Sequence, residues 1–296
     1  MPAGAPALDL PLPSTASPFV TAVTGASAQR SHATPPEGES TFIPITSRED
    51  PGTPRTLRLE AILYRPNPTD TFPVVIFNHG STGMGAIPTR RSYTYAVQAQ
   101  YLLSRGYAVV VPMRKGRGQS EGTYAESEEP SCDFATWAPG IASAMEDLDG
   151  IIEYLAQQPY ADVSRLLLAG QSRGGFLSVA YAAKGTYRSQ VKGVINFVGG
   201  WVFEGCRPND FNRWSYGELG KLTTLPMLWL YAEGDPSYSP NAIKSYVQAF
   251  TESGGVVDFH LFRQVPENGH RLLNYPDLWQ APVDKYLDAL ARGQRQ

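Results

Sequence analysis

Short apolar runs recur along the chain at the length and spacing typical of β-strands. Eight segments show the pattern: "TFIPIT" (41–46), "TLRLEAILYRP" (56–66), "FPVVIFNHG" (72–80), "YAVVVPM" (107–113), "RLLLAG" (165–170), "VKGVINFVGG" (191–200), "LPMLWLYAEGD" (225–235) and "VVDFHLFRQV" (256–265). The second alternates polar and apolar residues, as a half-exposed antiparallel strand does. The third to the seventh are nearly continuous apolar runs, which indicates parallel strands covered on both faces.

Helical segments are predicted between these strands, at residues 93–105, 141–158, 174–184, 240–253 and 278–292. The fourth has Ser239 as an expected N-cap and Pro240 at its first helical position. The alternation predicts an α/β fold, with a doubly wound, mostly parallel sheet of about eight strands and helices on both faces. In such sheets ligands bind beyond the carboxyl ends of the strands.

The first 40 residues differ from the rest, because they are rich in Pro, Ala, Ser, Thr and Gly and show no sustained period. We expect an irregular tail over 1–40, followed by a single domain over 41–296. "ASAQ" at 26–29 resembles the cleavage site of a secretory signal, although Asp9 and four early prolines interrupt the apolar stretch that such a signal needs. A signal remnant would indicate a secreted or periplasmic protein, and an ordinary tail is equally compatible with the cytoplasm, so localisation stays open.

Composition narrows the function classes. Hydrophobic residues make up 42% of the 296 residues and charged residues 18%, which is typical of a folded globule. A net charge of −3 without a Lys/Arg cluster argues against nucleic-acid binding, and no apolar run approaches the length of a transmembrane helix. Neither cysteine lies in a CxxC pair, so no metal or other cofactor is predicted. The sequence carries no signal of oligomeric state.

The segment Gly170-Gln171-Ser172-Arg173-Gly174 fits G-x-S-x-G and lies between an apolar strand and a helix. That context predicts a nucleophile elbow, in which a sharp turn presents the serine. A serine hydroxyl stays protonated near neutral pH, so it needs a base, and the base needs an orienting group.

The base can be chosen among four histidines by elimination. His32 lies in the irregular tail. His79 ends a strand and suits a structural role in an oxyanion loop, and His260 lies within a strand as a packed or edge-strand side chain. His270, in "ENGHRLL", follows the last strand at the expected active edge. It is the predicted base.

The orienting acid should follow the preceding strand, where "LWLYAEGDPSYSP" offers Glu233 and Asp235. We favour Asp235, because the flanking glycine and proline predict a turn that aims a short carboxylate inward, and Glu233 remains the alternative. The order Ser172, Asp235, His270 is the triad order of α/β-hydrolases.

A tetrahedral oxyanion needs preorganised N–H donors. The backbone N–H of Arg173 is one expected donor. The other is expected from "NHGSTG" (78–83), with Ser81 preferred and Thr82 as the alternative. A plain glycine-rich turn is the competing interpretation of this segment.

"NHGSTG", "GQSRGG", "EGDPSYSP" and "NGH" occur in this order over roughly residues 55–292. With these motifs the chain resembles an α/β-hydrolase and is similar to the dienelactone hydrolase and prolyl-oligopeptidase-like esterase groups. The resemblance implies a serine esterase without a cofactor. "MRKGRGQSEG" (113–122) keeps only part of the motif D-x-R-G-x-G-x-S-x-G, with Met113 in place of Asp and Lys115 in place of Arg. Small dienelactone hydrolases carry a cysteine nucleophile, whereas this chain has Ser172.

Two aromatic-rich segments, 122–140 and 199–220, are expected to form cap-like loops at the active edge. Trp137, Trp201 and Trp214 are the predicted substrate-binding residues of an acyl or aryl pocket, and packing of the loops is the alternative role. Cys132 and Cys206 lie in these loops, where an exported protein would hold either a disulfide or two free thiols.

The predicted function is hydrolysis of a small-molecule carboxylic ester through an acyl-enzyme intermediate. Two alternatives remain at this point. One is a peptidase or amidase on the same triad, and the other is a catalytically silent binding protein that keeps the fold.

Overall fold

The computed structural model describes residues 37–47, 53–81, 91–126, 134–202 and 209–293, and every structural statement below concerns these ranges. Nearly all of the predicted N-terminal tail, residues 1–36, therefore lies outside the described residues. Loop residues 127–133 and 203–208, with Cys132 and Cys206, lie outside them as well.

Eight strands form one sheet in the order β1-β2-β4-β3-β5-β6-β7-β8. Their bounds are β1 Glu39–Ser47, β2 Arg55–Tyr64, β3 Phe72–Asn78, β4 Ala108–Pro112, β5 Ala161–Gln171, β6 Val191–Phe197, β7 Met227–Ala232 and β8 Val257–Phe262. The pairs β1–β2 and β2–β4 are antiparallel, and all the other neighbours are parallel. The predicted fold class is confirmed.

Burial of the strands follows their apolar runs. Every residue of β4 and β7 is buried, as expected for strands that helices cover on both faces. The second strand is antiparallel as predicted, but it is exposed only in its first half, since all its residues from Leu59 to Tyr64 are buried. Exposed and buried residues instead alternate in β1, from Phe42 to Ser47, at the edge of the sheet.

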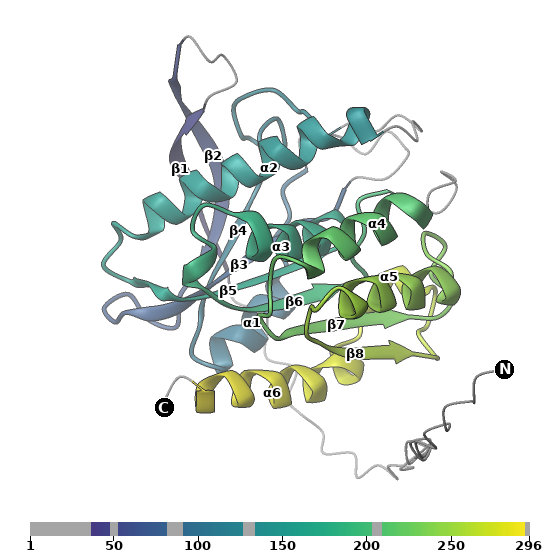
Figure 1. Ribbon diagram of the computed structural model, residues 1–296. Coiled ribbons are helices and arrows are strands. Elements are labelled where there is room, and N and C mark those ends of the chain that lie inside the picture. Colours follow the sequence, from purple (N-terminus) through teal and green to yellow (C-terminus); the bar gives the residue numbers. More distant parts are fainter. Residues whose placement is uncertain (1–36, 48–52, 82–90, 127–133, 203–208, 294–296) are drawn as a thin grey trace, which may run out of the picture. The chain divides into compact units, whose positions relative to one another are not determined.

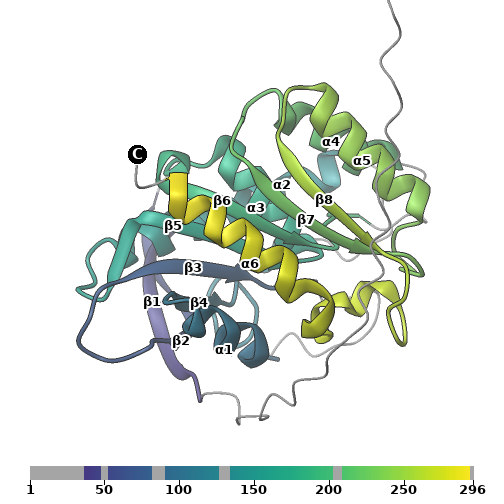
Figure 2. The same ribbon diagram turned by 90° about the horizontal axis from the view of Figure 1, so that it is seen from below.

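Two groups of helices cover the sheet (Figures 1 and 2). Helices α1 and α6 lie on one face, and α2, α3, α4 and α5 lie on the other. Their bounds are α1 Ala96–Ser104, α2 Phe134–Leu155, α3 Arg173–Lys184, α4 Asn209–Gly220, α5 Pro240–Glu252 and α6 Pro276–Gly293, with 3-10 helices at η1 Arg188–Gln190 and η2 Gly269–Asn274. The Ser239 hydroxyl accepts a hydrogen bond from the Ala242 N–H, which confirms the predicted cap of α5. No described helix combines the length and the apolar character that crossing a membrane requires.

The prediction of two cap-like loops was wrong in extent. Helix α2 already begins at Phe134, inside the segment 122–140, and α4 occupies Asn209–Gly220, which includes the whole C-terminal half of the segment 199–220. Helix α4 buries Phe211, Tyr216 and Leu219 on one face. These residues have helical spacing, but they are separated by polar side chains and glycines, so the segment resembles an aromatic-rich loop.

The topology gathers the candidate residues at one edge. Ser81 follows β3, Ser172 follows β5, Asp235 follows β7 and His270 follows β8. These four strands are parallel, so their carboxyl ends lie at the same edge of the sheet. The candidate residues therefore share the edge at which doubly wound sheets bind ligands.

Candidate active site

Ser172 lies at a strained turn between β5 and α3. Its backbone angles are φ 54° and ψ −122°, a combination that costs a non-glycine residue about 1–3 kcal/mol. Two hydrogen bonds to the end of β6 and the segment after it hold the turn. The Ser172 N–H donates to the Phe197 carbonyl at 2.9 Å, and the Ser172 carbonyl accepts from the Gly200 N–H at 3.3 Å. The sharp turn predicted for the serine is therefore present, fixed to the end of β6.

Gly174 explains why glycines crowd around this serine. A Cβ atom at Gly174 would lie 2.0 Å from the Asn78 carbonyl oxygen and 2.6 Å from the His79 carbonyl oxygen. Both are backbone atoms that cannot move aside, so only glycine lets α3 begin this close to the end of β3. The close approach also places Gly80 beside the serine, since a Cβ atom on Gly80 would lie 3.5 Å from Ser172 Cβ.

His270 and Asp235 form the pair expected of a base and its orienting acid. The Nδ1 atom of His270 lies 2.9 Å from Asp235 Oδ2 and 3.1 Å from Oδ1. A carboxylate can only accept, so Nδ1 carries the hydrogen and Nε2 keeps its lone pair. The Asp235 carboxylate is inaccessible to solvent and also accepts from the Ser237 N–H at 2.7 Å. Glu233 instead lines a surface cavity of about 970 Å³.

Gly269 allows this pair to form. A Cβ atom at Gly269 would lie 2.6 Å from the Glu233 carbonyl oxygen and 2.8 Å from the Asp235 nitrogen. The Gly269 N–H donates to the Gly234 carbonyl at 3.1 Å. The glycine of "NGH" therefore brings the loop that carries His270 against the loop that carries Asp235.

His79 is a buried, neutral residue of the loop after β3. Its Nε2 accepts from the Arg114 N–H at 3.2 Å, and its Nδ1 donates to the Gly80 carbonyl at 2.7 Å. Burial, together with the positive charge of Arg114, lowers the pKa of His79 to about 3. Both ring nitrogens are engaged, so His79 orients the loop in the way that its sequence position indicates.

The two remaining histidines are not among the side chains described at this site. His260 lies on β8 at the edge of the sheet, with Nε2 3.1 Å from Asp258 Oδ1. It is the edge-strand side chain that the sequence indicates. His32 lies outside the described residues.

The two predicted oxyanion donors, the N–H groups of Arg173 and Ser81, belong to the start of α3 and to the loop after β3. Arg173 is the first residue of α3, so the helix itself supplies no acceptor for its N–H. The Gly80 N–H donates to Tyr95 Oη at 3.3 Å, which leaves the half-buried Ser81 as the next residue along the loop. Thr82, the alternative donor, lies outside the described residues.

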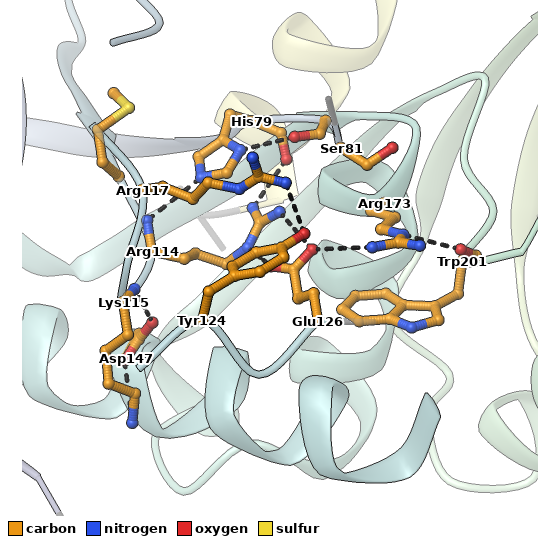
Figure 3. A network of polar contacts seen from close by, with 12 residues as sticks. His79, Ser81, Arg114, Lys115, Arg117, Tyr124, Glu126, Asp147, Arg173 and Trp201 are labelled. Atoms are coloured by element: carbon orange, nitrogen blue, oxygen red, sulfur yellow. Dashed lines mark hydrogen bonds and ion pairs between the residues drawn. The ribbon is translucent and has the colours of Figure 1, made fainter. Parts of the chain in front are cut away.

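The carboxylate of Glu126 joins the elbow to the loop after β3 (Figure 3). It is buried and bonded to Arg114, through Nε and at 3.2 Å through Nη2, and it lies 3.4 Å from Arg173 Nη1. Arg114 Nη1 also donates to the His79 carbonyl at 2.8 Å. Burial alone would raise the pKa of Glu126, but the neighbouring charges of Arg114 and Arg173 hold it at about 2. The carboxylate is therefore ionised between two guanidinium groups.

The three predicted pocket tryptophans separate in the structure. Trp137 and Trp201 are buried, and both ring centroids lie 5.3 Å from the Arg173 guanidinium carbon. Arg173 Nε donates to the Trp201 carbonyl at 3.0 Å. Trp214 is 53% exposed and lines a different cavity of about 230 Å³, between α2, α3 and α4. The structure does not bring the three together, and their role in substrate binding stays a prediction.

Met113 and Lys115, the two residues after β4 that depart from the family motif, each make specific contacts in the structure. Met113 is buried in the core, and its Sδ accepts from the Tyr93 N–H at 3.3 Å. Lys115 is buried, with its N–H donating to Asp147 Oδ2 at 2.9 Å and its ammonium group paired with Glu146. The lysine therefore fastens this loop to α2. Within the described ranges, no group of three or more His, Cys, Asp or Glu side chains could hold a metal ion.

Residues 59–277 match the model of the dienelactone hydrolase family. The chain belongs to this family. It is therefore a hydrolase with an α/β-hydrolase fold, as its motifs indicate. No match was found among curated proteins.

Solved structures show the same fold as this dienelactone hydrolase family member. An esterase of Pyrococcus furiosus superposes with a TM-score of 0.59 at 14% identity, over 86% of this chain and 91% of the esterase. A putative dienelactone hydrolase of Klebsiella pneumoniae gives 0.54 at 17% identity, over 83% and 98%. An acylaminoacyl peptidase of Pyrococcus horikoshii gives 0.56 at 17% identity, over 83% of this chain but only 41% of the peptidase.

Sequence reasoning missed several residues that shape the site. Glu126 begins the acidic run "ESEE", which is typical of an exposed loop, yet its side chain is buried. Arg114 and Tyr95 carry no local signal either. One signal was available in the sequence. Arg173 directly follows Ser172 at the end of a buried strand, and a buried arginine requires an acidic partner.

We expect Glu126→Gln to destabilise the protein by about 3 kcal/mol, because it leaves two buried guanidinium groups without a carboxylate. The pKa of Glu126 lies below its usual value, so its contribution is present above about pH 4.5 and is lost as pH falls toward 2. Urea unfolding of wild type and variant at pH 6 and pH 3 should show a smaller difference at the lower pH.

Glu121→Gln is the matched control, since Glu121 pairs with Arg58 at the exposed surface. It should change the free energy of unfolding little. Equal costs for the two variants would contradict the role assigned to Glu126.

Proposed function

We propose that this protein hydrolyses carboxylic esters with Ser172 as nucleophile, His270 as general base and Asp235 as the group that orients His270. The observation that carries the proposal is the bond from His270 Nδ1 to the inaccessible Asp235 carboxylate, at the edge where the strained Ser172 lies. Membership of a hydrolase family supports it.

The mechanism follows from the atoms that each residue presents. Ser172 Oγ attacks the ester carbonyl carbon while His270 Nε2 takes the hydroxyl proton. The N–H groups of Arg173 and Ser81 are the proposed donors to the oxyanion. The C–O bond then breaks, and His270 returns the proton to the leaving alcohol, which yields an acyl-enzyme. Water activated by His270 releases the acid and restores Ser172.

Asp235 supports each proton transfer without moving a proton itself. Its carboxylate holds the imidazole with Nε2 available and stabilises the imidazolium that forms. Within the described ranges Ser172 has no hydrogen bond to His270, so the proposal requires the two side chains to meet when substrate is bound. The neighbouring Gln171 already bonds the His270 backbone at 3.1 Å.

A catalytically silent binding protein is a weaker alternative. The backbone strain at Ser172 and the burial of the Asp235 carboxylate both lower stability, and a binding role uses neither. Strain of this kind is concentrated at functional sites, so it supports an enzyme.

Peptide hydrolysis is the second candidate, because the fold also matches an acylaminoacyl peptidase. The likeness extends over 91% of the P. furiosus esterase and 98% of the K. pneumoniae protein, but over 41% of the peptidase. The part of this chain that the fold comparison covers thus corresponds to nearly a whole esterase, which supports esters as the substrate class.

We expect Ser172→Ala and His270→Ala each to lower kcat on a short-chain p-nitrophenyl ester by at least roughly a thousandfold, because members of a triad act as a unit. His260→Ala is the control, since His260 also pairs with an aspartate but lies on the edge strand. It should retain wild-type turnover. Activity of Ser172→Ala within tenfold of wild type would refute the nucleophile.

Asp235→Asn should lower kcat by orders of magnitude, although less than loss of the serine or the histidine, because the amide cannot stabilise the imidazolium. Glu233→Gln should have little effect, since Glu233 lines the surface cavity. Steady-state kinetics on one ester compares them, and a larger loss in Glu233→Gln would mean that the acid has been misassigned.

Ester turnover should exceed turnover of the matching anilide or peptide by at least roughly a thousandfold in kcat/KM, or about 4 kcal/mol of transition-state stabilisation. An amide carbonyl is less electrophilic, and its amine leaves only when protonated. One active-site-titrated sample should be used for both substrates. Comparable rates would favour the peptidase.

A further inference from the structure

One amide side chain joins the three loops that carry the proposed machinery. Gln171, the residue before Ser172, donates from Nε2 to the His270 carbonyl at 3.1 Å and accepts at Oε1 from Tyr95 Oη at 3.3 Å. Tyr95 Oη accepts in turn from the Gly80 N–H at 3.3 Å. We call this series of contacts, Gly80–Tyr95–Gln171–His270, the Tyr95–Gln171 bridge.

The direction of every hydrogen bond in the bridge is fixed by its two ends. A backbone N–H, here that of Gly80, can only donate, and a carbonyl, here that of His270, can only accept. Gln171 must therefore present its NH₂ group to His270 and its oxygen to Tyr95, and the tyrosine hydroxyl must accept from Gly80 and donate to Gln171. No other arrangement satisfies all four residues.

The bridge includes a second residue in an unfavourable conformation. Tyr95 has φ 45° and ψ 38°, the left-handed region that a bulky residue rarely adopts, at the N-cap of α1. Its ring packs on Phe77, with centroids 4.6 Å apart, and on Tyr93. Burial raises the pKa of the Tyr95 phenol far above its usual value, so the hydroxyl stays protonated and can donate.

We propose that Tyr95 and Gln171 are positioning residues, which hold the loop after β3 and the His270 loop at a fixed separation on either side of Ser172. The proposal rests on the ester-hydrolase function proposed above. In this proposal the bond from the Gly80 N–H to Tyr95 orients the loop so that the Ser81 N–H is the next available donor. The bond from Gln171 to the His270 carbonyl holds His270 between Asp235 and Ser172. Neither side chain is assigned a contact with the reacting atoms.

A positioning residue and a residue that only packs affect different measurable quantities. Preorganised donors and a fixed base lower the barrier to the chemical step, whereas a stabilising contact alone changes only the folded fraction. Loss of the bridge should therefore lower kcat with little change in KM. Since the two side chains act in series, either loss alone should disconnect the loops.

The test is a double-mutant cycle of Tyr95→Phe and Gln171→Met in the full chain. Each single variant should lower kcat on a p-nitrophenyl ester by about tenfold, with KM within about twofold. The double variant should be no worse than the more damaging single one, because contacts in one network are not additive. Thermal unfolding of each variant establishes that it is folded.

Tyr101→Phe is the matched control. Tyr101 lies on α1, the helix that Tyr95 precedes, and is half-buried, and its Oη donates to Asp284 Oδ1 on α6 at 2.7 Å. This variant should lose some stability but keep kcat within about twofold. If Gln171→Met does not fold, Gln171→Glu replaces it, since the carboxylate still accepts from Tyr95 but cannot donate to His270.

Wild-type kcat in folded Tyr95→Phe, or losses that multiply in the double variant, would overturn the bridge. A loss of kcat in Tyr101→Phe equal to that in Tyr95→Phe would also overturn it. Failure of the proposed function has a different signature, because Ser172→Ala would then keep its turnover. An inactive Ser172→Ala together with unaltered Tyr95→Phe contradicts the bridge alone.

Discussion

The backbone contact between the start of α3 and the end of β3 is the constraint on which the rest of the site depends. It requires the absence of a side chain at Gly174, where any Cβ atom would collide with the Asn78 carbonyl. The contact places the loop after β3 beside Ser172, which is itself held at a positive φ by bonds to the end of β6 and to the segment after it. A hydrogen-bonded turn against two neighbouring strands can maintain strain that an isolated turn would relax.

Buried charge orients the loops around this contact. Glu126 lies between Arg114 and Arg173, and Arg114 also bonds the carbonyl of the neutral His79. Removing such groups from water is costly, so a buried ion pair is weak evidence for stability. Its geometry is more informative, because the same carboxylate contacts the residue after Ser172 and the arginine that holds the loop after β3. The network therefore ties the two proposed oxyanion donors to one anchor.

The fold could be predicted from the sequence because each strand is a local apolar run. The candidate site residues could be expected to share one edge of the sheet because parallel strands end there. Ser172 and His270 are candidates on this ground, and turn chemistry favours Asp235 over Glu233, in agreement with the bond between Asp235 and His270. Local patterns fail where the deciding contact is distant. Gln171 is hydrogen-bonded to Tyr95 and His270, which lie 76 and 99 residues away in the sequence. A hydrophobic period does not predict a single side-chain bond of this kind.

The wrong extent of the predicted loops has the same origin. Helix α4 alternates aromatic with polar residues, so its sequence does not show one apolar face. The structure identifies that face by its contacts with α3 and α5. Trp137 and Trp201 are predicted to line a substrate pocket, and the structure adds a contact that the sequence does not indicate, because both rings lie against the Arg173 guanidinium. An aromatic side chain can pack on a charged group beside a nucleophile, line a substrate pocket, or do both, and the sequence alone does not separate these roles.

The proposed function requires one activated serine, Ser172, to perform the chemistry. The most direct measurement is labelling of the full-length protein with a fluorophosphonate, followed by intact mass and peptide mapping alongside residual ester turnover. We expect one adduct per chain, on the peptide that contains Ser172, with turnover falling in proportion to labelling. An adduct on another residue, or full ester turnover after Ser172 is completely labelled, would contradict it.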